Sequence, residues 1–453
     1  MREDEQDDRS GLERALSLVT DVRPGEGVTA LLLVLNVFIL MTAYLTIKPV
    51  REGLILAMKS GAEYKAYMGG AIAVALLFAV PLYARLADRT QKHRLVVGVT
   101  LFFAANLVVF LAASEVEAVR TRLGLVFYLW IGVFNMMVVA QFWAFANDVY
   151  TEEQGKRLFP LLGVGQTVGA LSGSVVAALL LETLGLGLFQ LLIVGALLLC
   201  LSAALTWIAH ARERGLARPS EPPVSLQRPI AERSGRRGAF ELVLRHRYLT
   251  LLAVFSLLFT FVNSNGEYML GKLLKEDVAL RVAAGVLAES AAKEHLGAAY
   301  NRLYLYVGIG TVLLQTFVVS RVIKHAGLRV AFFVFPAIAL ADAALIAALP
   351  LLAICFVGKV AENSVDYSVN NTVRNVLWLP TTQEMKYKAK QAVDSFFVRM
   401  GDVSSALLVF TLAQTLGLGV RAFALTNVAL VAVWLWTAAA ILRENARLHE
   451  GAG

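Results

Sequence analysis

The sequence predicts an all-α membrane protein whose twelve helices form two six-helix halves. Hydrophobic residues make up 58% of the chain and charged residues only 17%, whereas soluble domains carry about one quarter charged residues. Apolar stretches of about 20 residues, the length that crosses ~30 Å of hydrocarbon, recur along the whole chain. One long polar break near the middle separates six of these stretches from six more.

The polar and acidic first 27 residues lack the features of a cleavable signal peptide, so we expect the first apolar stretch to remain as a helix. The predicted spans are 28–56, 66–86, 95–113, 126–149, 160–182, 187–209, 249–274, 300–320, 330–349, 351–376, 391–416 and 421–442. An even number of spans places both termini on the same side of the membrane.

Lysine and arginine predict which side that is. The loops after the even-numbered spans are the basic ones. They hold Arg85, Arg89, Lys92 and Arg94, then Lys156 and Arg157, nine arginines from Arg212 to Arg247, then Arg321, Lys324 and Arg329, and finally Lys386, Lys388 and Lys390. Because cytoplasmic loops carry the excess of Lys and Arg, we expect both termini in the cytoplasm of a bacterium and the spans in its inner membrane.

The polar break at 211–248 contains four prolines and is expected to be a cytoplasmic linker. It divides the chain into a tail (1–27), a first half (28–210), a second half (249–442) and a C-terminal tail (443–453). We interpret its arginines as lying beside anionic lipid rather than as a nucleic-acid site.

Nothing in the sequence indicates an enzyme, a cofactor or a metal centre. Cys200 and Cys355 lie far apart in apolar segments, and the histidines fall at loops or helix ends. Gly163 and Gly165, followed by Gly169, resemble part of a dinucleotide-binding motif. Because they open a membrane helix with no preceding strand, we interpret them as small residues for close helix contact.

Ionisable residues inside the predicted spans are the candidate site. Such a residue costs several kcal/mol in hydrocarbon and is kept mainly where it meets a partner, a substrate or water. The candidates are Lys48 and Arg51 in span one, Glu267 and Lys272 in span seven, Lys359, Glu362, Asp366, Asn370 and Arg374 in span ten, and Asp394, Arg399 and Asp402 in span eleven. The span-ten residues recur every three or four positions and predict a polar stripe that lines a cavity.

Three of these assignments leave alternatives open. Arg51 and Glu52 are also consistent with a cap on span one at the outer surface, and Arg399 with Asp402 is consistent with a structural pair. Glu267 is consistent with a role in coupling or gating of transport and also with a structural ion pair. The polar run 263–266 before it is expected to loosen the helix and admit water.

Two loops resemble each other and a known superfamily. Residues 83–94 after span two resemble the G-x-L-x-D-R-x-x-R/K-R loop of the major facilitator superfamily, and residues 319–329 after span eight form a degenerate copy. The resemblance implies parallel six-helix repeats with a binding site between them near the membrane midplane. We assign gating to Asp88 and Arg89 of the first loop.

Further segments resemble the ATP/ADP translocases of plastids and intracellular bacteria. These are residues 46–52, 142–147 (Phe-Trp-Ala-Phe-Ala-Asn), 152–163, Glu267 through Lys272, and Tyr367-Ser368 with Arg374 and Pro380. The match in 142–163 is the longest, and its Asn147 and Lys156 join the gating candidates. In that family, charged residues of helices one, seven and ten are important for nucleotide transport. The resemblance therefore implies roles for Arg51, Glu267 and Arg374, with Lys48 and Lys272 adjacent.

The sequence also departs from the family pattern. Pro49 stands where the family has an acid, Arg374 replaces a lysine, and Asp366, Asn371 and Asn375 replace charged residues of helix ten. Arginine keeps the positive charge and adds a bidentate grip on phosphate, whereas the other changes alter the charge balance of the cavity.

The resemblance implies a transporter of a nucleotide or another phosphorylated anion, with ATP and ADP among the candidates, acting by alternating access as a monomer. Lys48, Arg51, Lys272 and Arg374 would hold phosphate oxygens, and Glu267 would balance charge, couple a proton or enforce exchange. One alternative is a proton-coupled carrier of another organic anion or a drug exporter. An alternative of another class is a non-transporting membrane scaffold or lipid-interacting protein.

Overall fold

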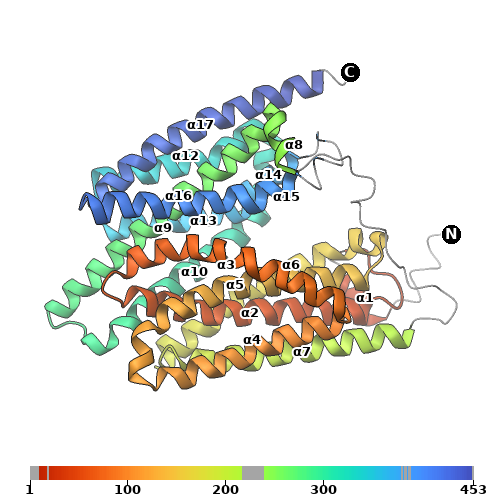
Figure 1. The fold of residues 1–453 in the computed structure, drawn as a ribbon. Coiled ribbons are helices and arrows are strands. Elements are labelled where there is room, and N and C mark those ends of the chain that lie inside the picture. Colours follow the sequence, from red (N-terminus) through yellow and green to blue (C-terminus); the bar gives the residue numbers. More distant parts are fainter. Residues whose placement is uncertain are drawn as a thin grey trace. The chain divides into compact units, whose positions relative to one another are not determined.

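Helices make up nearly all of the described chain. The computed structural model describes residues 10–17, 20–216, 239–378, 381, 385 and 389–450. Within these ranges it contains helices and short connections and no strand (Figure 1). Three short helices, α1 (Gly11–Leu16), α8 (Ala239–Arg245) and η4 (Glu289–Ala291), accompany the long ones.

Every predicted span falls on a long helical segment. The first six are α2 (Gly27–Leu56), α3 (Gly61–Arg89), α4 (Lys92–Ser114), α5 (Glu117–Val149), α6 (Glu152–Ala178) with η2 (Leu179–Thr183), and α7 (Gln190–Leu216). The later six are α9 (Arg247–Ala283), α10 (Ala292–Phe317), α12 (Gly327–Ala348), α13 (Leu352–Val365) with η6 (Asp366–Asn370) and α14 (Asn371–Val376), α15 (Lys390–Ala392) with η8 (Val393–Phe397), α16 (Val398–Val409) and η9 (Phe410–Thr415), and α17 (Val420–Glu450). Between α10 and α12 lie α11 (Val319–Arg321) and η5 (Val322–Ala326).

Length and hydropathy alone identify nine of these segments as able to cross a membrane, counted over the described residues. The other three are α3, α10 and the α13–α14 segment, and the last carries the predicted polar stripe. Helix ends also extend beyond the predicted spans: α3 begins at Gly61 rather than 66, and α10 at Ala292 rather than 300. A hydropathy window stops at the first polar turn, whereas a helix continues through it into the interface.

The chain divides into two compact units, each with its own packing. Unit 1 comprises Met1–Leu54, Ala75–Leu226 and Tyr300–Arg302, and unit 2 comprises Ile55–Val74, Gln227–Ala299 and Leu303–Gly453. Helix α3 therefore contributes its first part to unit 2. The linker predicted at 211–248 stays a prediction, because residues 217–238 lie outside the described part of the chain.

Glycines allow α2 and α6 to approach closely in unit 1. A Cβ on Gly169 would collide with the backbone carbonyl of Phe38, and one on Gly173 would lie 2.5 Å from the carbonyl oxygen of Thr42. The Thr42 hydroxyl donates to the Gly169 carbonyl at 3.1 Å. Small residues permit such contact between membrane helices. These contacts support the interpretation of the glycines as packing residues, although Gly163 itself has open space around it.

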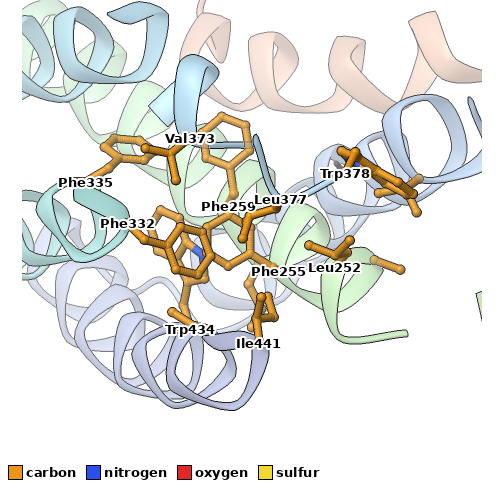
Figure 2. Packing of buried hydrophobic residues seen from close by; sticks show 14 of the residues in the cluster. Leu252, Phe255, Phe259, Phe332, Phe335, Val373, Leu377, Trp378, Trp434 and Ile441 are labelled. Carbon is orange, nitrogen blue, oxygen red and sulfur yellow. The ribbon is translucent and has the colours of Figure 1, made fainter. Parts of the chain in front are cut away.

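An aromatic core holds the helices of unit 2 together (Figure 2). The Phe255 ring of α9 stacks on Phe332 of α12 at a centroid distance of 4.8 Å, and Trp434 of α17 meets Phe335 edge-on at 5.3 Å. Trp434 is completely buried. Phe259, one turn after Phe255, extends the same face of α9. This core joins α9, α12 and α17.

Candidate functional site

A chain of ion pairs in unit 2 links α3, α9 and α13. The Nζ atom of Lys65 lies 3.0 Å from Oε2 of Glu267, whose other oxygen, Oε1, lies 3.9 Å from Nζ of Lys359. Lys359 also pairs with Glu362 at 3.0 Å and donates to the side-chain oxygen of Asn263 at 2.7 Å. The Lys359 side chain is completely buried, and that of Glu267 is one-quarter exposed. Opposite charges compensate one another inside a membrane-spanning unit.

Helical spacing and one glycine bring these groups together. Lys359 and Glu362 are three residues apart and share a face of α13, as Asn263 and Glu267 do four apart on α9. Gly266 faces them: a Cβ at this position would lie 3.2 Å from both Cδ and Nζ of Lys359. The glycine therefore leaves room for the lysine to reach across α9.

The expectation that residues 263–266 loosen the helix is wrong in this structure, because α9 runs unbroken from Arg247 to Ala283. The polar side chains bond to other helices instead of opening their own. Ser264 donates to Asp402 at 2.7 Å, and the Asn265 amide bonds to Asn427 at 2.9 Å. Partners on neighbouring helices satisfy the polar side chains, so α9 keeps its backbone hydrogen bonds.

A second ion pair lies farther along α9. Lys272 pairs with Glu63 of α3 at 2.8 Å, and the Tyr268 hydroxyl donates to the same carboxylate at 3.3 Å. Lys275 donates to the backbone carbonyls of Met58 and Lys59. The Lys272 side chain is 34% exposed. It is therefore the predicted phosphate-binding cation of unit 2 that is most accessible from outside the protein.

Sequence reasoning missed Glu63, Lys65 and Asp342. The first two precede the apolar stretch of span two and resemble interfacial charges, although Lys65 is buried. Asp342 is also buried, and it is the one ionisable residue in the stretch 330–349. That isolation was a signal of the same kind as the one that identified Glu267.

The other predicted site residues of unit 2 have further partners. Arg374 lies 3.0 Å from Asp394, with its guanidinium 5.5 Å from the centre of the Phe259 ring. Arg399 pairs with Asp402 at 3.0 Å, as the structural alternative expected. The Asn370 amide donates to Asp366 at 2.7 Å within η6. This five-residue segment is a π-helical turn, a feature frequent at functional sites.

Lys48 and Arg51 belong to unit 1 and contact aromatic rings there. The Arg51 guanidinium lies 4.5 Å from the centre of the Tyr128 ring and donates through Nε to Glu52 at 2.9 Å. The Lys48 ammonium lies 5.7 Å from the centre of the Tyr44 ring. Glu52 is completely buried and α2 continues to Leu56. Both features disfavour the alternative that Arg51 and Glu52 only cap the helix end.

The four gating candidates also belong to unit 1. Asn147 is exposed near the end of α5, two residues before Val149. Asp88 and Arg89 fall at the end of α3 and Lys156 in the first turns of α6, and their side chains lie outside the described part of the structure. Their roles stay predictions.

The fold is that of known membrane transporters. A bacterial homologue of the human lysosomal transporter Spinster superposes with a TM-score of 0.57 over 94% of this chain and 98% of its own, at 14% identity. The nucleoside transporter NupG superposes with a TM-score of 0.55 over 92% of this chain and 98% of its own, at 12% sequence identity. The human organic anion transporter MFSD10 superposes with a TM-score of 0.56 over 92% of this chain and 100% of its own, at 14% sequence identity. The chain is therefore a multi-pass membrane protein, and its predicted major-facilitator fold is confirmed.

Residues 119–445 match the model of the TLC ATP/ADP transporter family, and the chain belongs to that family. ADP,ATP carrier protein 5 of Rickettsia bellii is 25% identical over 318 residues, which cover 62% of this chain and 61% of the relative. ADP,ATP carrier protein 1 of Chlamydia trachomatis is 23% identical over 340 residues, which cover 67% of this chain and 62% of the relative. The match thus spans about three fifths of the length of these relatives. Membership of a transporter family agrees with the expectation that the chain is no enzyme.

Proposed function

We propose that this protein is a carrier that moves a nucleotide or another phosphorylated anion by alternating access. Family membership and the transporter fold support this proposal. The observation that carries it is the pairing of Lys65 with Glu267 and of Lys272 with Glu63. Each pair holds a cation inside a membrane-spanning unit by means of a carboxylate that an anionic solute can replace.

The exchange of partners gives a physical mechanism for binding. Phosphate oxygens accept charge-assisted hydrogen bonds from an ammonium much as a carboxylate does. When the solute binds, its phosphate takes the place of Glu63 at the partly exposed Lys272. When it leaves, Glu63 pairs with the lysine again and spares the protein an uncompensated charge in the membrane. Arg374 has a similar carboxylate partner in Asp394.

Uptake into liposomes tests this function. Purified protein is reconstituted into vesicles preloaded with ADP, and uptake of labelled ATP, ADP, phosphate and simple organic anions is measured. Lys272→Gln is expected to reduce uptake of the phosphorylated solute at least tenfold, and Lys272→Arg to keep most of it because the positive charge remains. Lys324→Gln, at an exposed lysine of η5, is the matched control.

Each result has a distinct meaning. If the vesicles take up only organic anions that lack phosphate, the alternative function, a carrier of another organic anion, would replace this proposal. Absence of uptake of every solute tested, from protein shown to be folded, would favour a membrane scaffold or lipid-interacting protein. Equal uptake by Lys272→Gln and the wild type would remove Lys272 from the site.

We also propose that the protein acts as a monomer in a bacterial inner membrane with both termini in the cytoplasm. The asymmetry of Lys and Arg between successive loops supports this orientation. The fold supports the oligomeric state, because a major-facilitator chain carries both repeats, and with them a complete central site, in one polypeptide. Molecular mass measured by light scattering of the detergent-solubilised protein tests the monomer.

A further inference from the structure

The two predicted halves contain the same turn. Thr183-Leu184-Gly185-Leu186-Gly187 and Thr415-Leu416-Gly417-Leu418-Gly419 are identical in sequence. The first follows the π-helical end of span five, η2, and the second follows the π-helical end of span eleven, η9. In both turns the first glycine has a positive φ, +63° at Gly185 and +64° at Gly417, which glycine adopts without strain.

The backbone hydrogen bonds of the two turns also correspond. The N–H groups donate from Leu184 to Leu179 and from Leu186 to Leu180 in the first turn, and from Leu416 to Thr411 and from Leu418 to Leu412 in the second. The shared turn therefore identifies α6 with η2, and α16 with η9, as equivalent helices of the two repeats.

Two other equivalent helices, α3 of span two and α10 of span eight, each pack with the opposite half. Residues 55–74, which include the first part of α3, belong to unit 2, and Tyr300–Arg302 of α10 belong to unit 1. In unit 2, a Cβ on Gly69 of α3 would lie 3.6 Å from the Cβ of Asp402 on α16. In unit 1, the corresponding neighbour of α10 is α6.

One buried hydrogen bond and one exposed ion pair join α10 to the end of span five. The Asn301 side chain donates from Nδ2 to the backbone carbonyl of Ser174 at 3.0 Å. Asn301 is completely buried, and Ser174 is 1% exposed. Nε of Arg302 lies 3.5 Å from Oε1 of Glu182, the residue before the shared turn, and both side chains are more than 40% exposed. The contact thus has a buried part and a solvent-accessible edge.

The buried part of this contact is incompletely satisfied. Within the described part of the chain, no group hydrogen-bonds to Oδ1 of Asn301 or to Oγ of Ser174, although both atoms are buried. A buried polar group without a partner raises the free energy of the state that buries it. If α6 and α10 part, water can reach both atoms. The closed contact is therefore held less firmly than its complete burial suggests.

A buried asparagine that joins two helices of the same half differs in this respect. Asn36 of α2 donates to the Thr206 hydroxyl of α7 at 2.8 Å and accepts from the Ser202 hydroxyl at 2.6 Å. Both ends of its amide are satisfied, as is usual for buried polar groups in permanent packing. Asn301 is satisfied at one end only, in a contact that joins helices of different halves.

We propose that the Asn301–Ser174 contact is a gate between α6 and α10, which is closed in this structure and opens during the transport cycle. Its role in transport rests on the proposed function, whereas its opening does not. When the gate opens, the hydrogen bond between Asn301 and Ser174 breaks and water hydrates both side chains. The unsatisfied atoms of the closed gate keep the two states close in free energy, so that each can be populated.

Spin labels at Glu182→Cys and Arg302→Cys, in a Cys200→Ser background, measure opening without any solute. An exposed ion pair contributes little to stability, so the labelled protein is expected to fold. We expect electron paramagnetic resonance to detect a short distance from the closed gate and a longer one from the open gate. Ser174→Ala should raise the ratio of closed to open gate at least about fivefold, because it removes an unsatisfied hydroxyl from the closed state.

Ser202→Ala is the matched control, because its hydroxyl has a partner in Asn36. It should lower the melting temperature and leave the ratio of the two distances unchanged, whereas Ser174→Ala should not lower the melting temperature. A single short distance in the wild type would overturn the proposal. So would an unchanged ratio in Ser174→Ala, or a loss of melting temperature in this variant as large as in the control.

Cross-linking separates this inference from the proposed function. A short reducible reagent that joins the cysteines at 182 and 302 should stop uptake of labelled ATP or phosphate into liposomes, and reduction should restore it. Arg23→Cys with Glu153→Cys, another exposed ion pair of unit 1, is the matched control, and its cross-link should leave uptake intact.

Undiminished uptake by protein fully cross-linked between 182 and 302 would overturn the gate and keep the transport function. Two distances between the spin labels, without uptake of any anion by the protein before cross-linking, would keep the opening of the contact and reject the transport function.

Discussion

Glu267 shows at the scale of a single residue how the structure changes the meaning of a predicted site. The sequence identified it as a lone acid in an apolar helix. In the structure it accepts from Lys65 and lies beside Lys359, so it compensates two buried ammoniums. The two ion pairs therefore give Glu267 a charge-compensating role in the fold, and its coupling role stays a prediction.

We expect Glu267→Gln to destabilise the protein by about 3 kcal/mol or more, because removing one partner of a buried pair leaves charge uncompensated. Glu276→Gln, at an exposed acid of the same helix, should change the free energy of unfolding by less than about 0.5 kcal/mol. Denaturant titration in mixed micelles measures both. A Glu267→Gln variant as stable as the wild type would contradict the assignment of this carboxylate to Lys65.

Glu26 provides a residue-scale prediction outside the membrane-spanning helices. Burial alone would raise the pKa of its carboxyl. Hydrogen bonds from the Arg157 guanidinium at 2.8 and 3.0 Å, from the backbone N–H of Arg23 and from Gln154 outweigh burial and hold the pKa below its ordinary value of 4.5. A lowered pKa means that the carboxylate stabilises the fold above the unfolded pKa, and that this contribution is lost as the pH falls through the folded pKa.

Glu26→Gln should therefore lower the melting temperature at pH 7, with a loss of about 1–3 kcal/mol. The difference from the wild type should shrink as the pH falls from the unfolded pKa of about 4.5 through the lower pKa of the folded protein, where the wild-type carboxylate becomes protonated. Glu153→Gln is the matched control, because its pair with Arg23 is more than half exposed on both sides. A difference between wild type and Glu26→Gln that is constant from pH 7 to pH 3 would contradict the pKa assignment.

At the scale of elements, close helix packing depends on which glycines face a neighbour. Gly163 and Gly169 lie on the same helix and look alike in sequence. Gly163 has open space around it, whereas a side chain on Gly169 would meet the α2 backbone at Phe38. The α2–α6 contact thus needs some of the glycines of α6 and tolerates change at others.

Gly169→Ala should destabilise the protein by about 1–3 kcal/mol, because α2 and α6 must separate to admit the methyl group. Gly163→Ala should be neutral or slightly stabilising, since alanine favours the helix and the site is open. Thermal unfolding of the two variants, purified in the same detergent, measures the difference. Equal melting temperatures would show that the two helices do not approach as closely as described.

At the scale of the whole molecule, the chain has two compact units, and the predicted site residues are divided between them. Lys48 and Arg51 belong to unit 1, and the other predicted binding residues belong to unit 2. Each unit therefore holds its own part of the predicted set of cations.

Orientation in the membrane is the prediction that belongs to this scale. A short tag inserted near Arg228 should be cytoplasmic and one near Glu289 external, because the basic loops stay on the cytoplasmic side. Labelling of intact cells with a membrane-impermeant reagent measures both positions. A Glu289 tag that reacts only after the cells are permeabilised would reverse the proposed orientation.

The sequence by itself determined the fold class, the twelve helical segments and the family, because hydrocarbon thickness sets span length and the family motifs are local. It also identified Glu267, Lys272 and Lys359, since isolated charges stand out in apolar stretches. Only the tertiary structure decided their partners. Glu63 and Lys65 come from α3, which is distant in sequence from α9, and a charge becomes part of a cluster through helix packing that no local pattern specifies.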